Sequence, residues 1–173
     1  MVLLMIRVLA SATCAAVLTL GPAQVHAQTL DDWVEWGDRV HGGFGSLIAL
    51  GIRIGLDALQ RLGAQRREVR VDYTDGPQTP CACVLDGIAI AVSASLGQGT
   101  LALAGARTEP GLLARIDLWH RSTGQGLRYE IPADVLGLMQ AINSREDAIG
   151  RMRAVTEIDA ALLFRVTDST ALR

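Results

Sequence analysis

The chain has 173 residues, of which 50% are hydrophobic and 20% are charged, and it carries a net charge of -2 at pH 7. This length suits a single domain with a substantial core. Because the balance is slightly acidic and the arginines form no basic stripe, the composition argues against a nucleic-acid-binding protein.

Residues 1–27 have the features of a secretory signal peptide. Arg7 gives a positive start, the apolar run Val8–Leu20 is about thirteen residues long, and Val25-His26-Ala27 offers small residues for cleavage. The run is shorter than the roughly 20 residues that span a bilayer. We therefore predict that residues 28–173 form one exported domain, periplasmic or secreted, without a membrane span.

The first half of this domain is predicted to contain two helices and a strand. A short helix over Leu30–Asp38 would be capped near Asp31 or Asp32, and an apolar helix over Leu47–Leu62 would end at Gly63. Gly51 and Gly55, four residues apart, predict that another backbone approaches the apolar helix closely. Alternating residues predict a half-exposed strand over Arg67–Tyr73.

The second half begins with a central helix and then becomes mostly extended. The predicted elements are a helix over Cys83–Ser95, a turn at Gly97 and Gly99, strands over Thr100–Ala104 and Leu112–Arg121, a hairpin loop over Ser122–Gly126, a strand over Leu127–Ile131, a helix from Pro132 to about Asn143, a helix capped by Ser144, and a strand over Leu162–Val166. This order predicts an α+β fold. Helices would cover one face of a mixed sheet, with a helix-strand-helix unit before the antiparallel strands and one parallel pairing.

Cys81 and Cys83 are the cysteines that remain after the signal and its Cys14 are removed. Four states stay open for them: a labile disulfide, a metal-binding pair, an intermolecular bridge, or two packed thiols. Because a bond between residues i and i+2 closes a very small ring, we favour two packed thiols over the disulfide.

Several segments, taken in order, resemble the FmdE family of formylmethanofuran dehydrogenase proteins. They are His41-Gly42 before the apolar helix with Ala49–Arg53, then Cys83–Ile88, Leu96–Leu101, Ile116–Gly124 and Leu162–Val166. The resemblance runs from Trp33 to Val166. It implies an α+β fold shared in outline with the catalytic domain of glyceraldehyde-3-phosphate dehydrogenase, often a homodimer, and a metal or cofactor role.

The chain departs from this family at several polar positions. The family's first motif resembles His-Gly-His-x-Cys-Pro, but here Gly43 and Gly45 stand in place of the second histidine and the cysteine. Ala94 stands in place of the cysteine in a Thr-Gly-Cys-Thr segment. Cys83 and Asp86 match the family, and Cys81 is an addition.

Two kinds of ligand are consistent with these residues. A transition metal such as zinc favours thiolates and imidazoles, which makes His41, Cys81, Cys83 and His120 candidate ligands. A small ligand would contact Asp86 and the backbone of Gly97 and Gly99, whose N–H groups suit an anion.

The leading hypothesis is a noncatalytic, exported binding domain that holds a metal ion or small ligand around His41 and the cysteine pair. One alternative is a thiol-dependent enzyme with Cys83 as nucleophile and His41 as base. Another alternative is an accessory or assembly subunit of an exported redox enzyme.

Overall fold

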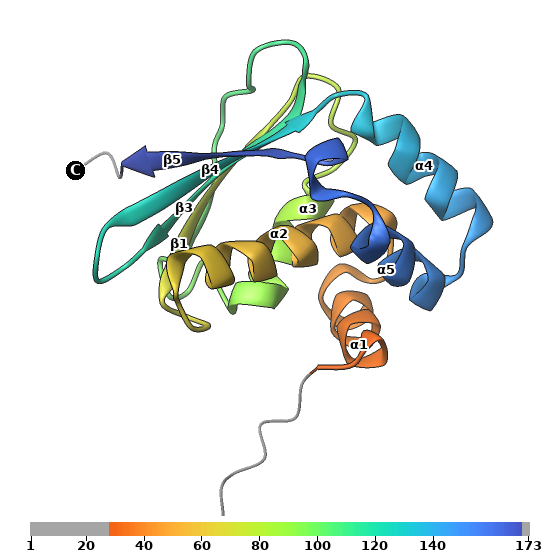
Figure 1. The fold of residues 1–173 in the computed structure, drawn as a ribbon, viewed down its shortest axis with the longest axis horizontal. Coiled ribbons are helices and arrows are strands. Elements are labelled where there is room, and N and C mark those ends of the chain that lie inside the picture. Colours follow the sequence, from red (N-terminus) through yellow and green to blue (C-terminus); the bar gives the residue numbers. More distant parts are fainter. Residues whose placement is uncertain (1–27, 171–173) are drawn as a thin grey trace, which may run out of the picture.

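The computed structural model describes residues 28–170, so the predicted signal peptide lies outside the described residues. Its elements are α1 (Leu30–His41), α2 (Ser46–Leu62), β1 (Val69–Asp75), α3 (Cys83–Val92), β2 (Leu101–Leu103), β3 (Leu112–His120), β4 (Gln125–Pro132), α4 (Val135–Arg145), α5 (Ala148–Glu157), the short 3-10 helix η1 (Ala160–Leu162) and β5 (Arg165–Thr170). The strands form one open sheet in the order β2-β1-β3-β4-β5. Figure 1 shows the helices gathered on one side of this sheet. The predicted α+β class is confirmed.

The sheet is mixed because one pairing follows a crossover. After β1 the chain runs through α3 and returns as β2, which pairs with β1 in parallel, Val71 opposite Leu101. The remaining pairs are antiparallel. Val69, Val71 and Tyr73 are fully buried on the helical side of the sheet, so the predicted alternation and the predicted parallel pairing are both confirmed.

Helices α2 and α3 cross at a contact that admits no side chain. A Cβ atom on Gly51 would overlap the carbonyl oxygen of Val84, and one on Gly87 would overlap the carbonyl oxygen of Ile48. Gly55 faces Ala91 further along the same contact. The predicted close approach of another backbone to α2 is therefore confirmed, and α3 is the partner.

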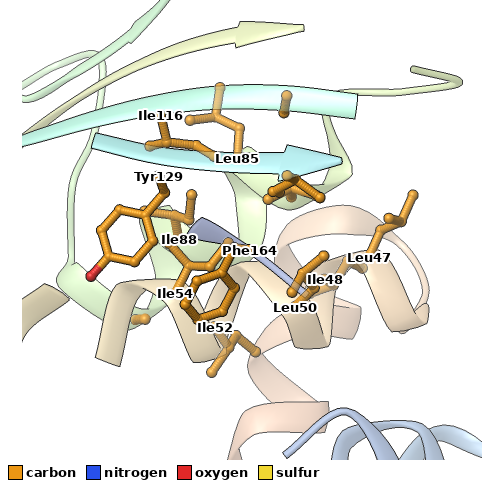
Figure 2. Close-up of a cluster of buried hydrophobic side chains, with 14 of the residues drawn as sticks. Leu47, Ile48, Leu50, Ile52, Ile54, Leu85, Ile88, Ile116, Tyr129 and Phe164 are labelled. Atoms are coloured by element: carbon orange, nitrogen blue, oxygen red, sulfur yellow. The ribbon is translucent and has the colours of Figure 1, made fainter. Parts of the chain in front are cut away.

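The core lies between this helix pair and the sheet. Figure 2 shows Ile54 of α2 and Ile88 of α3 reaching toward Ile116 and Tyr129 of the sheet. All four side chains are fully buried. Burial of each aliphatic side chain contributes about 1.5–3 kcal/mol, which makes this layer the main source of stability for the helix pair.

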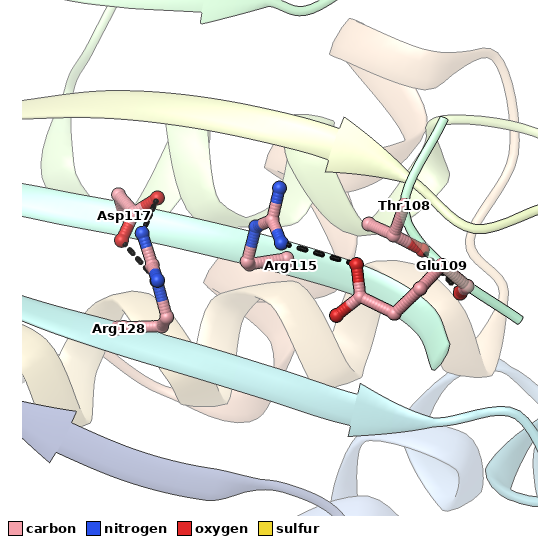
Figure 3. A network of polar contacts seen from close by, with 5 residues as sticks. All are labelled: Thr108, Glu109, Arg115, Asp117 and Arg128. Atoms are coloured by element: carbon pink, nitrogen blue, oxygen red, sulfur yellow. Dashed lines mark hydrogen bonds and ion pairs between the residues drawn. The ribbon is translucent and has the colours of Figure 1, made fainter. Parts of the chain in front are cut away.

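The opposite face of the sheet is polar. Figure 3 shows Arg128 donating two hydrogen bonds to the carboxylate of Asp117, at 2.8 and 3.1 Å, and Arg115 donating one to Glu109 at 3.3 Å. The hydrogen bond to Asp117 raises the pKa of Arg128. This face of the sheet therefore carries exposed and half-buried ion pairs, and the apolar side chains lie on the face that the helices cover.

Three predicted helix boundaries were wrong because another residue supplied the cap or the stop. Thr29, rather than Asp31 or Asp32, caps α1. Its hydroxyl oxygen accepts a hydrogen bond from the Asp32 N–H, and the Asp32 carboxylate accepts one from the Thr29 N–H. Asp147, rather than Ser144, caps α5 by accepting a hydrogen bond from the Gly150 N–H. The central helix stops at Val92, because Ser93 turns into the left-handed region with φ of 56°.

The strand boundaries differ for similar local reasons. Arg67 adopts φ of 71°, so β1 begins two residues later than predicted. Pro132 ends β4 opposite Leu112 and does not open α4. The 3-10 turn at Ala160–Leu162 delays the last strand to Arg165.

Within residues 28–170, no single helix is long and apolar enough to cross a membrane. Helices α1 and α2 taken together have the length and composition of a membrane span, but they meet at a bend of 114°.

Candidate functional site

The candidate site lies where the end of α1 meets the start of α3. His41 is the last residue of α1, and Gly42 after it adopts φ of 83°, a left-handed conformation that glycine adopts without strain. On the other side, Cys83 is the first residue of α3. Asp86 follows three residues later, so the sulfur and the carboxylate share one face of the helix.

The His41 ring bridges this sulfur and this carboxylate. Its Nδ1 lies 2.7 Å from Asp86 Oδ2, and its Nε2 lies 3.5 Å from Cys83 Sγ. Because a carboxylate only accepts hydrogen bonds, Nδ1–H is the donor to Asp86, and this contact orients the ring so that Nε2 faces the sulfur. The arrangement therefore orients one imidazole nitrogen at Cys83.

Cys81 and Cys83 are joined in a disulfide, with their Cα atoms 5.3 Å apart. The interpretation as two packed thiols is therefore wrong for this state, and the intramolecular disulfide is correct. Ala82 has φ of -76° and ψ of 32°, outside regular helix, so the chain bends there and brings Cys81 back toward the first turn of α3. Cys81 is exposed, whereas Cys83 is 8% exposed.

A cavity of about 510 Å³ opens beside the disulfide. It is lined by His41, Gly42, Gly43, Phe44, Gly45, Leu47, Ile48, Pro80, Cys81, Cys83, Leu136, Met139, Gln140, Asn143 and Arg151. The volume lies within the range of about 300–1,000 Å³ that is usual for small-molecule sites, and the lining combines apolar walls with a few polar groups.

Helices α4 and α5 hold the glycine-rich turn that forms one wall of the cavity. Arg151 donates hydrogen bonds to the carbonyl oxygens of Phe44 and Asn143, each at 2.9 Å. Asn143 Oδ1 accepts from the Ser46 N–H at 2.8 Å and so caps α2, whose N-cap residue Gly45 has no side chain to do so. Sequence reasoning missed Arg151 and Asn143. The glycine at the start of α2 signalled that a cap must come from elsewhere, but not from which residue.

Two of the three positions at which the chain was expected to depart from the family pattern fall on this cavity, whereas Ala94 does not line it. Gly43 and Gly45 both line it, so no imidazole or thiol projects from the turn. Among residues 28–170, no group of three or more His, Cys, Asp or Glu side chains is placed to hold a metal ion in this oxidised form. The two sulfur atoms are bonded to each other, which removes both thiolates from the donor set.

Two other predicted contacts lie in a different part of the fold. His120 and Gly99 line a second cavity of about 400 Å³, formed with Arg70, Asp72 and Trp119 among others. His120 Nδ1 accepts a hydrogen bond from the Ser122 N–H at 3.2 Å. The Gly99 N–H donates to the Leu96 carbonyl oxygen, so it is already used. The structure therefore does not bring His120 or Gly99 to His41.

Gly97 lies in the exposed turn after α3, and a Cβ atom there would meet nothing within 4 Å. Of the residues predicted from the sequence, His41, Cys81, Cys83 and Asp86 come together at one place.

Comparison with known families gives a match over most of the chain. The model of the family described as FmdE, Molybdenum formylmethanofuran dehydrogenase operon, matches residues 40–163. This range contains His41, both cysteines and Asp86. No curated protein matches the chain.

Proposed function

Because the chain belongs to the FmdE family, we propose that it is an exported binding domain that holds a metal ion or small ligand in the cavity beside His41. The observation that carries this proposal is the chain of contacts from Asp86 through His41 to Cys83, at 2.7 and 3.5 Å. It places an oriented imidazole nitrogen and a sulfur next to each other at the wall of one cavity.

The spacing of these two atoms suits a soft metal ion. Zinc bonds of about 2.3 Å to sulfur and 2.0 Å to nitrogen, at a tetrahedral angle, separate the two ligand atoms by about 3.5 Å. The Nε2 to Sγ distance is 3.5 Å. Reduction of the disulfide would add Cys81 as a third donor, and zinc bound there would act as a Lewis acid toward a small ligand in the cavity.

Asp86 supports the same interpretation. Histidines that bind metals commonly donate their other ring N–H to a carboxylate, which orients the ring and makes it a stronger ligand. His41 does this with Asp86 at 2.7 Å. The proposed ligands are thus His41, Cys81 and Cys83 in the reduced protein, with Asp86 as the residue that positions His41.

Cobalt(II) titration tests the proposal, because thiolate-to-cobalt charge transfer absorbs in the near ultraviolet. The full chain is reduced, freed of reductant under anaerobic conditions and titrated. We expect the absorption in the wild type and its loss when Cys81 and Cys83 are both replaced by serine. Asp86→Ala should weaken cobalt affinity by about 10- to 100-fold, the usual effect of removing a partner of a metal-binding histidine.

His120→Ala is the matched control, because its imidazole lies in the second cavity and its loss should leave cobalt binding unchanged. Absence of the charge-transfer absorption in the reduced wild type would refute the metal version of the proposal. Equal binding by wild type and Asp86→Ala would refute the role given to Asp86.

Export and partnership form a second part of the proposal. The features of residues 1–27 support secretion, and the operon named in the family description supports an accessory role beside an exported redox enzyme. Mass measurement of the protein isolated from the periplasm should show a chain that begins near Gln28. Affinity capture from the same fraction should recover a defined redox enzyme. A full-length product in the cytoplasm would contradict export.

A further inference from the structure

We propose that the Cys81–Cys83 disulfide is redox-active, oxidising dithiol substrates by thiol-disulfide exchange in which Cys81 is attacked and Cys83 leaves. This activity goes beyond the binding role, because it uses the oxidised state of the pair and requires no bound ligand. It rests on the exposure of the two sulfurs, on the neighbours of Cys83 and on the adjacent cavity.

The two cysteines differ in their accessibility. Cys81 is exposed in the segment that precedes α3, whereas Cys83 is 8% exposed and begins the helix. Exchange requires a thiolate to approach one sulfur of the disulfide while the other departs. The exposure difference assigns attack to Cys81 and departure to Cys83.

The surroundings of Cys83 favour a departing sulfur. It lies at the start of the ten-residue helix α3, where Ala82 provides no side-chain cap, and the partial positive charge of a helix N-terminus favours a negative charge there. His41 Nε2 lies 3.5 Å from the sulfur on its other side. A helix N-terminus stabilises a departing thiolate, and Nε2 can donate a hydrogen bond to it once the ring has taken up a proton from the substrate thiol.

The cavity supplies room for a substrate beside the disulfide. Cys81 and Cys83 both line its wall, and Phe44, Leu136 and Met139 add apolar surface. A substrate that carries apolar groups next to its thiols would bury them here. The class of substrate is therefore a dithiol, either a small molecule or a reduced cysteine pair in a peptide.

The exchange balances without another reactant. The first substrate thiolate bonds to Cys81 Sγ, the Cys81–Cys83 bond breaks, and its electron pair leaves on Cys83 Sγ. The second substrate sulfur then attacks the first, the substrate disulfide forms, and Cys81 leaves as a thiolate. The proton that the first substrate thiol loses as its thiolate forms passes through His41 Nε2 to Cys83, and the proton of the second substrate thiol ends on Cys81. The substrate is oxidised by two electrons, and the protein disulfide is reduced by two electrons.

The site of attack can be tested with a monothiol. The oxidised full chain is mixed with glutathione, quenched with acid, alkylated with iodoacetamide and mapped by fragmentation mass spectrometry, which separates Cys14 from the pair. We expect glutathione on Cys81 and the alkyl group on Cys83 at early times. Equal labelling of both sulfurs, or glutathione first on Cys83, would overturn the assignment.

The contribution of His41 can be tested with dithiothreitol and with a reduced two-cysteine peptide as separate substrates. We expect His41→Ala to slow reduction of the disulfide at least tenfold, whereas the control His120→Ala reacts like the wild type. Circular dichroism verifies that both variants are folded. Equal rates for wild type and His41→Ala with both substrates would overturn the proposal, and faster reaction with one substrate identifies the source of the dithiol.

These results are separable from the test of metal binding. A protein that binds cobalt once reduced but whose disulfide reacts equally fast with and without His41 retains the binding role and loses the redox activity. A protein that exchanges as expected but binds no cobalt retains the redox activity and loses the metal site.

Discussion

Replacement of Gly51 by alanine should push helix α2 away from helix α3, which begins at Cys83. The new Cβ atom would overlap the Val84 carbonyl oxygen and crowd Gly87 Cα and Ile88 N, each 2.9 Å away. These are backbone atoms that cannot rotate aside. Overpacking costs about 1–3 kcal/mol, occasionally more, and the backbone contact places this site at the upper end. The helix propensity gained from glycine to alanine returns about 1 kcal/mol.

We therefore expect Gly51→Ala to lower the free energy of unfolding by about 2 kcal/mol, measured by urea denaturation. Gly137→Ala is the matched control. It is also a glycine within a helix, but a Cβ atom there meets nothing within 4 Å. It should be neutral or stabilising by up to about 1 kcal/mol. Equal stability of the two variants would refute the close crossing of α2 and α3.

Three further changes test the core, the turn and a buried phenol. Ile88→Ala, at a side chain that is fully buried, should cost about 2–5 kcal/mol in urea denaturation, and a loss below about 1 kcal/mol would contradict the packing in Figure 2. Asn143→Ala removes the acceptor for the Ser46 N–H and should cost about 1–2 kcal/mol, whereas Asn143→Asp keeps an acceptor oxygen and should retain most of the stability. Burial, followed by the hydrogen bond to Asp57, raises the pKa of Tyr129 in the folded state, so its contribution is complete below the unfolded pKa of about 10 and declines above it. Wild type should therefore lose stability above about pH 10 more steeply than Tyr129→Phe, and parallel stability curves would contradict this.

Much of the fold could be predicted because its patterns are local. The alternation of Val69, Val71 and Tyr73 predicted β1, because a strand buried on one face has an apolar residue at every second position. The apolar run predicted α2, because a helix buried on most sides has apolar residues around most of its circumference. Boundaries were less predictable. Thr29 and Asp147 displaced the predicted caps because several polar residues near each helix start can accept the same backbone hydrogen bond.

The residue types of the candidate site could be predicted from the sequence, but which of the candidate residues lie together could not. His41, Cys83 and Asp86 stood out by their chemistry and their match to a family pattern. His120 and Gly99 stood out equally, yet they line another cavity. Nothing in the spacing separates these two groups, because the separation depends on how β3 and the turn after α3 lie relative to the end of α1.

By itself the sequence determined the fold class, the family resemblance and the close approach at Gly51, since each follows from side-chain size and order along the chain. Tertiary structure alone decided that His41 lies between Asp86 and Cys83, more than 40 residues away, with Nδ1 at 2.7 Å and Nε2 at 3.5 Å. It also decided the bond between Cys81 and Cys83, because the bend at Ala82 sets the direction of both sulfurs. Such placements follow from helices crossing in space, which no local spacing records.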